Sequence, residues 1–141
     1  MSGTALAEPV VDERELYFEN GLPGFPEAHR FTLNRWGDED SPFSILRSLE
    51  QEGLEFVVVP PVVFFPSYAP EVDDATVGRL ELHTSEDALL LAVVTLGDKP
   101  TDATANLMGP IVINRHTRKA AQAVLATSGY ELRTPLVGGE P

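Results

Sequence analysis

Cysteine is absent from the sequence, and this absence removes three kinds of site at once. A chain without thiols forms no disulfide framework, no thiolate zinc site and no cysteine nucleophile. Histidine is scarce as well: His29, His83 and His116 are isolated from one another, without the spacing of a metal site. The sequence therefore predicts a fold held by an apolar core, with no metal centre.

Long hydrophobic runs are also missing. The longest apolar segments, 56–59 with 62–65 and 88–96, are far shorter than the roughly 20 residues of a membrane span. The first 15 residues carry acidic side chains and lack the basic and apolar regions of a secretion signal. We therefore expect a cytoplasmic protein that does not enter a membrane.

Basic residues are few, because 10 lysines and arginines stand against 22 acidic residues and give a formal net charge of -12. The electric field of such an acidic protein repels nucleic-acid phosphates and attracts basic proteins. The alternative of equal weight is that the charge only keeps the protein soluble. The charge is unevenly spread, with acidic residues gathered over 71–87 and a basic cluster over 115–119. We expect protein partners and no direct binding of nucleic acid.

Catalytic motifs are not found in the sequence. Gly21 and Gly24 lie in a glycine- and proline-rich turn that favours positive φ, and no phosphate-binding Lys-Ser/Thr pair follows them. No serine has the flanking glycines of a nucleophile elbow. We therefore predict a protein that is not an enzyme and needs no cofactor or small-molecule substrate. A ligand-enclosing barrel or a hydrolase assembled only in three dimensions remains an alternative.

Hydrophobic periodicity predicts an all-β, mostly β fold. Residues with period-two alternation or β-branched runs occur near 16–18, 31–33, 43–45, 56–59, 88–96, 111–113 and 122–125. One short helix is expected at 73–80, because Asp73 and Asp74 offer an acidic N-cap. About eight short strands favour a small closed or nearly closed antiparallel β-barrel. The single domain is expected over 14–136, between a lead-in at 1–13 and a tail at 137–141.

Aromatic side chains gather where prolines interrupt the chain. Phe64, Phe65 and Tyr68 are hard to place wholly in a core, and exposed aromatic residues often anchor protein interfaces. Because prolines interrupt the segment, we expect 62–68 to lie near the surface. Phe64 and Phe65 fit equally well as the cap of one barrel end. Asn106 and Met108 allow the same two interpretations, contact with a partner or packing within the fold.

Several segments together carry a resemblance to one known family. They are Gly-Leu-Pro-Gly-Phe at 21–25, Ser-Pro-Phe at 41–43, and the valine, proline and phenylalanine residues of 56–66. The most specific block, at 102–119, reads Asp-Ala-Thr-Ala-Asn-Leu-Met-Gly-Pro-Ile-Val-Ile-Asn-Arg and ends in Thr-Arg-Lys. In order and spacing, these segments resemble the FliW family of flagellar assembly factors over nearly the whole folded region.

The resemblance implies a non-catalytic β-barrel that binds flagellin in the cytoplasm and also binds the carbon storage regulator CsrA, an RNA-binding translational repressor. Once flagellin is exported, the freed factor would antagonise CsrA allosterically, without competing with RNA, so that flagellin translation follows export. The resemblance adds Asn114 to the candidate partner-binding residues. A β-barrel chaperone or adaptor for another secreted protein is the alternative.

Overall fold

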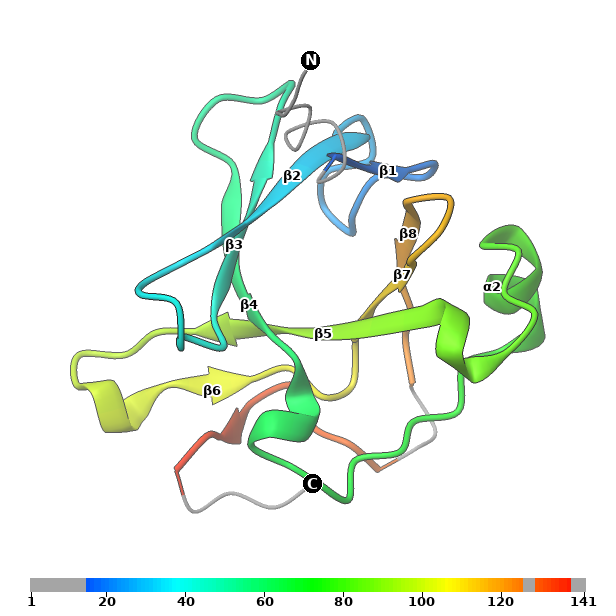
Figure 1. The fold of residues 1–141 in the computed structure, drawn as a ribbon. Coiled ribbons are helices and arrows are strands. Elements are labelled where there is room, and N and C mark those ends of the chain that lie inside the picture. Colours follow the sequence, from blue (N-terminus) through cyan, green and yellow to red (C-terminus); the bar gives the residue numbers. More distant parts are fainter. Residues whose placement is uncertain (1–14, 126–128, 138–141) are drawn as a thin grey trace.

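The computed structural model describes residues 15–125 and 129–137, and their strands form one continuous sheet (Figure 1). The strands are β1 (Glu15–Phe18), β2 (Arg30–Arg35), β3 (Ser44–Ser48), β4 (Glu55–Val59), β5 (Ala88–Thr95), β6 (Thr104–Ala105), β7 (Ile111–Asn114), β8 (Lys119–Gln122) and β9 (Thr134–Pro135). Their order is β4-β3-β2-β1-β8-β7-β5-β6-β9, and a further pairing of β4 with β5 closes the first seven into a barrel.

The barrel contains one parallel pairing, which corrects the expectation of a purely antiparallel barrel of about eight strands. Tyr17 of β1 lies beside Lys119 of β8 in parallel register, whereas the other pairs around the ring are antiparallel. Neighbours in an all-antiparallel ring must alternate in direction, so such a ring needs an even number of strands. A seven-stranded ring therefore requires a parallel neighbour. The prediction of a mostly β, closed barrel with a short helix is confirmed.

The apolar strands are buried on two faces, as their sequences predict. Along β7, Ile111 and Ile113 belong to the barrel core, whereas Val112 belongs to a separate cluster on the outer face. Leu91 and Leu90 of β5 divide between the same two clusters. Side chains of a strand alternate between its faces, so a strand covered on both sides needs a continuous apolar run.

The barrel interior is filled by side chains. Phe18 and Phe31 meet edge to face with ring centroids 5.1 Å apart. They pack with Leu46, Val58 and other buried residues into one core cluster to which all seven barrel strands contribute. A filled interior argues against the alternative of a barrel that encloses a ligand.

The second half of β5 pairs with β4 along one edge and with the short strand β6 along the other, so that β6 and its neighbour β9 form an extension of the sheet beyond the barrel ring (Figure 1). The segment that follows β4 folds beneath this extension as a 3-10 helix, η2 (Pro61–Val63), and then turns. We expected 62–68 to lie near the surface. This is wrong for Phe65 and Tyr68, which are 1% and 5% exposed and pack with Ala92, Ala105 and Leu107.

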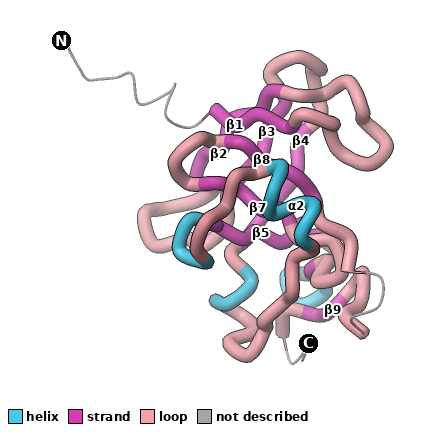
Figure 2. Tube along the Cα trace, turned by 90° about the vertical axis from the view of Figure 1, so that its right-hand side faces the viewer, coloured by secondary structure: helices cyan, strands magenta, loops and turns pink. Residues whose placement is uncertain are grey.

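One helix, α2 (Asp74–Arg79), lies outside the barrel beside β7 and β8 (Figure 2). Asp73 caps it as predicted, because its carboxylate accepts hydrogen bonds from the backbone N–H and the hydroxyl of Thr76. These bonds hold the pKa of Asp73 below its usual range. Leu80, at the end of the helix, packs with Val112 and Ala123 on the outer face of the sheet.

One predicted strand lies at a different position, and the predicted ends of the chain lie mostly outside the described residues. The last strand predicted at 122–125 is found at Lys119–Gln122, because Arg118 ends the preceding turn with a φ of 70° and the next residue is already extended. The predicted lead-in at 1–13 lies outside the described residues, as does the predicted tail except for Val137.

Candidate functional site

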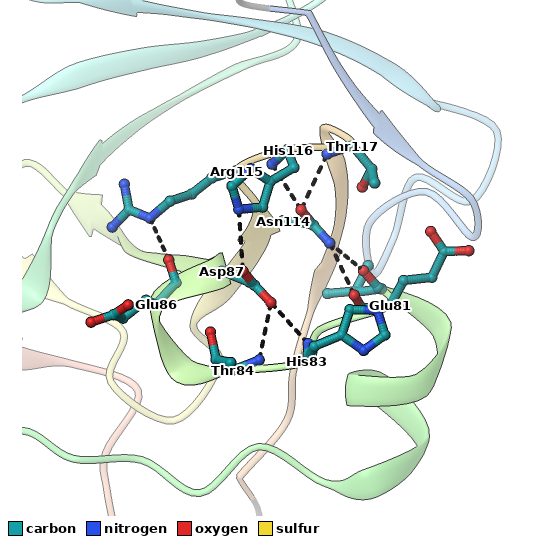
Figure 3. Close-up of polar contacts among 10 residues, drawn as sticks. Glu81, His83, Thr84, Glu86, Asp87, Asn114, Arg115, His116 and Thr117 are labelled. Atoms are coloured by element: carbon teal, nitrogen blue, oxygen red, sulfur yellow. Dashed lines mark hydrogen bonds and ion pairs between the residues drawn. The ribbon is translucent and has the colours of Figure 1, made fainter.

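A polar cluster joins α2 to the β7–β8 turn, and Asn114 is its centre (Figure 3). The Asn114 side chain is 2% exposed. Its Nδ2 donates to the carbonyl oxygens of Leu80 at 2.8 Å and Glu81 at 3.3 Å. Its Oδ1 accepts from the backbone N–H of His116 at 2.8 Å and Thr117 at 3.1 Å. A single amide therefore fixes both the end of the helix and the turn.

Asp87 is the second residue whose side chain holds this cluster together. It ends the 3-10 helix η3 (Ser85–Asp87), and its Oδ2 accepts from the backbone N–H of His83 at 2.9 Å and Thr84 at 3.0 Å. Its Oδ1 lies 3.1 Å from Nε2 of His116. The two backbone N–H groups, and then His116, hold the pKa of Asp87 below its usual range.

Unusual backbone geometry is concentrated at the same place. Among the described residues, Glu81 and Arg118 are the non-glycine residues with positive φ, at 58° and 70°. Lys119 Nζ lies 3.3 Å from Oε2 of Glu81, so an ion pair joins the two segments. Left-handed conformations cost energy for residues with a Cβ, and they tend to occur at functional sites.

The basic cluster predicted at 115–119 lies on this turn and is largely exposed. Arg115 donates through Nε to the carbonyl oxygen of Glu86 at 3.1 Å, and its backbone N–H bonds to the carbonyl of Asp87. The side chain of His116 is 70% exposed. The cluster therefore presents cationic side chains to solvent from a backbone that is held on both sides.

A surface groove adjoins the Asn114 cluster. A hollow of about 420 Å³ is lined mainly by apolar side chains from the segment before α2, the helix itself, and the outer faces of β5 and β7. A second hollow, of about 670 Å³, reaches Asn114 and His116. The two share Val77, Leu82 and His83, so they form one continuous groove, which we call the α2 groove. A mainly apolar groove with polar groups at one end is suited to binding a protein segment.

The aromatic candidates are mostly part of the core. Phe65 is buried, and the hydroxyl of Tyr68 donates to the carbonyl oxygen of Leu107 at 2.7 Å. Phe64 is half-buried and lies 5.9 Å from Phe43 between ring centroids. Tyr68 also meets Tyr130 edge to face. Among these residues, Phe64 keeps partial exposure, and partner contact by this segment stays a prediction.

The remaining candidates have structural partners too. Asn106 Oδ1 accepts from the backbone N–H of Met108 at 3.0 Å and Gly109 at 2.9 Å, so it closes the turn before β7. Asn106 and Met108 are half-buried, whereas Asn114 is enclosed. The structure brings Asn114 to the α2 groove and leaves the other five candidates elsewhere.

The described part of the chain offers no constellation for a metal: no three His, Cys, Asp or Glu side chains gather there. Within the same residues, no helix has both the length and the apolarity to cross a bilayer. What the site does offer is a groove with fixed walls and charged margins.

A family model described as FliW protein matches residues 3–136 of this chain. The chain belongs to the FliW family. The flagellar assembly factor FliW of Bacillus licheniformis is 40% identical over 131 residues, which cover 93% of this chain and 90% of that protein. The flagellar assembly factor FliW of Bacillus subtilis is 37% identical over the same shares of the two chains.

The fold agrees with a solved FliW structure. A crystal structure of the flagellar assembly factor FliW matches with a TM-score of 0.83 at 36% identity, covering 89% of this chain and 86% of that one. The resemblance predicted from the sequence segments is thus confirmed. The FliW match contains every residue of the Asn114 cluster and of the α2 groove.

Sequence reasoning missed the role of Asp87 in this FliW-family chain. Asp87 and His116 are 29 residues apart, and no sequence motif links them. The pair forms only because β5 and β7 are neighbours, with Ala88 beside Asn114 in register. The available signal was the polar residues that directly precede β5 and directly follow β7.

Proposed function

We propose that this chain is a flagellar assembly factor that acts by binding other proteins, without catalysis. The observation that carries the proposal is the agreement of sequence and fold with FliW proteins along nearly the full chain. The filled barrel supports it, because a packed interior offers a binding surface on the outside and no enclosed reaction chamber.

Its partners under this proposal are flagellin and the translational regulator CsrA, both met in the cytoplasm. While flagellin is present the factor is occupied. When flagellin is exported, the freed factor binds CsrA and relieves repression of flagellin synthesis, acting allosterically and not at the RNA site. These partners rest on the family resemblance, and the net charge of -12 supports attraction to a basic RNA-binding protein.

Calorimetric titration with CsrA from the same organism tests the proposal. We expect saturable binding that weakens as salt rises, because salt screens the attraction between an acidic surface and a basic partner. The titration is then repeated with the factor already saturated with flagellin, and binding of CsrA should be lost. If neither flagellin nor CsrA binds, the proposed partners are wrong and the family assignment is unaffected.

A chaperone or adaptor for another secreted protein is the second candidate, favoured by one observation. Val62 and Val63 are 55% and 52% exposed beside the half-buried Phe64, which gives a small apolar surface next to the β6–β9 extension. If the chain bound neither flagellin nor CsrA, and Val63→Asp abolished its binding of a different exported protein, this candidate would replace the first.

A further inference from the structure

The α2 groove has an apolar floor formed by the outer face of the barrel. Val112 of β7 and Leu90 of β5 lie at its base, and Val72, Val77 and Leu82 form the wall on the helix side. Four of these five are half-buried, which leaves apolar surface open beside the helix. Val72, Leu82 and Leu90 pack onto the outer cluster around the buried Leu80. The groove is therefore an extension of the core that remains uncovered.

The margin of the groove beside its apolar hollow is acidic, whereas the end at the β7–β8 turn carries Arg115 and His116. Glu71 and Asp74 flank the wall residue Val72, and Glu86 adjoins Ser85 in the lining. All three side chains belong to exposed residues, and within the described part of the chain none of their carboxylates forms an ion pair. Unpaired carboxylates around an apolar groove create a negative potential that attracts cationic groups.

The backbone at the groove is already paired. The floor strand β7 is hydrogen-bonded to β5 on one side and to β8 on the other, so it has no open edge for an added strand. A partner therefore cannot add a strand to the floor and must contact the floor through side chains. An amphipathic helix does this by placing residues i, i+3, i+4 and i+7 into an apolar groove.

The walls of the groove are held in place before any partner arrives. Asp73 caps the start of α2, Asn114 bonds to the carbonyls that follow its end, and Asp87 fixes His83 and Thr84. A preformed site avoids the entropy cost of ordering its walls on binding. The strained φ of Glu81 is maintained by the same contacts.

From these features we infer that the α2 groove docks a basic amphipathic helix of a partner protein. The apolar face of that helix contacts Val72, Leu82 and Leu90, and its flanking lysines or arginines face the carboxylates of the margin. The inference rests on the groove and its charges alone, and it does not depend on which protein supplies the helix.

The test uses a fluorescein-labelled synthetic peptide of about 18 residues, with leucine at i, i+3, i+4 and i+7 and lysine at the flanking positions. A second peptide carries glutamate in place of lysine, and a third has the same composition in scrambled order. Fluorescence anisotropy with the full chain should show saturable binding of the first peptide. The second and third should bind at least about tenfold more weakly.

Variants of the chain locate the binding. Val72→Asp places a charge in the apolar wall, and its matched control Val124→Asp changes a valine that is 64% exposed outside the groove. We expect at least about tenfold weaker binding for the groove variant and no change for the control. Thermal unfolding of both variants shows that each is folded.

A pair of charge reversals tests the margin without touching the apolar wall. Glu71→Lys with Asp74→Lys should weaken binding of the lysine peptide about tenfold and strengthen binding of the glutamate peptide. The control is Glu52→Lys with Asp98→Lys, which changes net charge equally at exposed positions outside the groove. Because these side chains are exposed, the charge-reversal variant should fold and can be tested even if Val72→Asp does not fold.

Three outcomes would overturn the inference. Equal losses in groove and control variants would mean nonspecific attraction to an acidic protein. Stronger binding of the glutamate or scrambled peptide to the unaltered chain would mean a different occupant. Concentration-dependent dimerisation that the margin variants abolish would mean that a second copy fills the groove. The same variants are also titrated with flagellin and CsrA. Failure of the groove inference can then be distinguished from failure of the proposed partners.

Discussion

Asn114 and Leu80 join the barrel to its only described α-helix, because Nδ2 of the buried amide donates to the Leu80 carbonyl at 2.8 Å. The carbonyl belongs to the end of α2, where the last groups of a helix lack partners within the helix. The amide also accepts two N–H groups of the β7–β8 turn. Two surface elements are thus held by one side chain of the sheet.

Replacing Asn114 should therefore destabilise the whole domain. Asn114→Ala leaves buried donors and acceptors without partners, and we expect a loss of about 1–3 kcal/mol in the free energy of unfolding, measured with urea. Asn34→Ala, at an exposed position of β2, is the matched control and should change stability little. Equal losses for the two variants would contradict the bridging role.

Asp87 should make stability depend on pH. Its pKa is lowered in the folded protein by the N–H groups of His83 and Thr84, and then by His116. Its carboxylate therefore stabilises the fold above the pKa of the unfolded chain, and this contribution is lost as the pH falls through the folded pKa. We expect Asp87→Asn to lower the thermal midpoint at pH 7 and to show a smaller deficit at about pH 3, below the pKa of an aspartate in the unfolded chain.

The control for this pH series is Asp98→Asn, at an exposed aspartate outside the cluster. It should show no deficit at either pH. A deficit of Asp87→Asn that stays constant from neutral to acidic pH would show that shape, and not the charge of the carboxylate, explains its effect.

Asn106 provides a test that separates folding from partner contact. Asn106→Ala removes the acceptor for Met108 and Gly109, so the free energy of unfolding should fall by about 1 kcal/mol. Asn106→Asp keeps an oxygen acceptor and should retain most of the stability. If partner affinity falls with Asn106→Asp while its thermal midpoint is retained, the side chain contacts a partner directly.

Tyr68 should contribute through its hydroxyl group. Tyr68→Phe removes the bond to the Leu107 carbonyl, and we expect a loss of about 1 kcal/mol on urea unfolding. Tyr17→Phe, at a tyrosine that is 46% exposed, is the control and should be nearly neutral. An equal effect of the two changes would show that the buried bond adds no stability.

Alkaline pH extends this test. Burial raises the pKa of Tyr68, and the proximity of Tyr130 adds to the shift. The neutral phenol is therefore favoured in the fold, and its contribution is present below the unfolded pKa and lost as the pH rises above it. The original chain should lose stability more steeply with rising pH than Tyr68→Phe.

Local patterns in the sequence predicted much of this fold. Alternation gave the positions of β1 and β2, the continuous apolar runs gave the doubly covered β5 and β7, and Asp73 gave the start of α2. These features depend on neighbours along the chain. Strand period and helix capping are set within a few residues, so a single sequence is enough to detect them.

Pairing between distant segments could not be predicted in the same way. Alternation tells which side chains share a face, but not which strand lies beside β1, so the parallel β1–β8 pair and the ring of seven were missed. Phe65 and Tyr68 were expected near the surface because prolines surround them. Their irregular backbone is buried beneath the β6–β9 extension, with the Tyr68 hydroxyl bonded to Leu107.

The candidate site was predicted only in part for the same reason. The basic turn at 115–119 is visible in the sequence, whereas its anchors, Asp87 and the Leu80 carbonyl, come from segments brought together by the β5–β7 pairing. The α2 groove has no sequence motif, because its walls come from four separate segments.

The β1–β8 pair also sets an order for synthesis of the protein. Tyr17 emerges from the ribosome well before its partner Lys119, because the two residues are far apart along the chain. The β1–β4 meander is synthesised first, but its outer strands β4 and β1 each keep an unpaired edge until β5 and β8 have been made. Closing so long a loop is slow, and open strand edges are prone to aggregation. A nascent chain that stalls before residue 119 therefore exposes the edges that the finished barrel conceals.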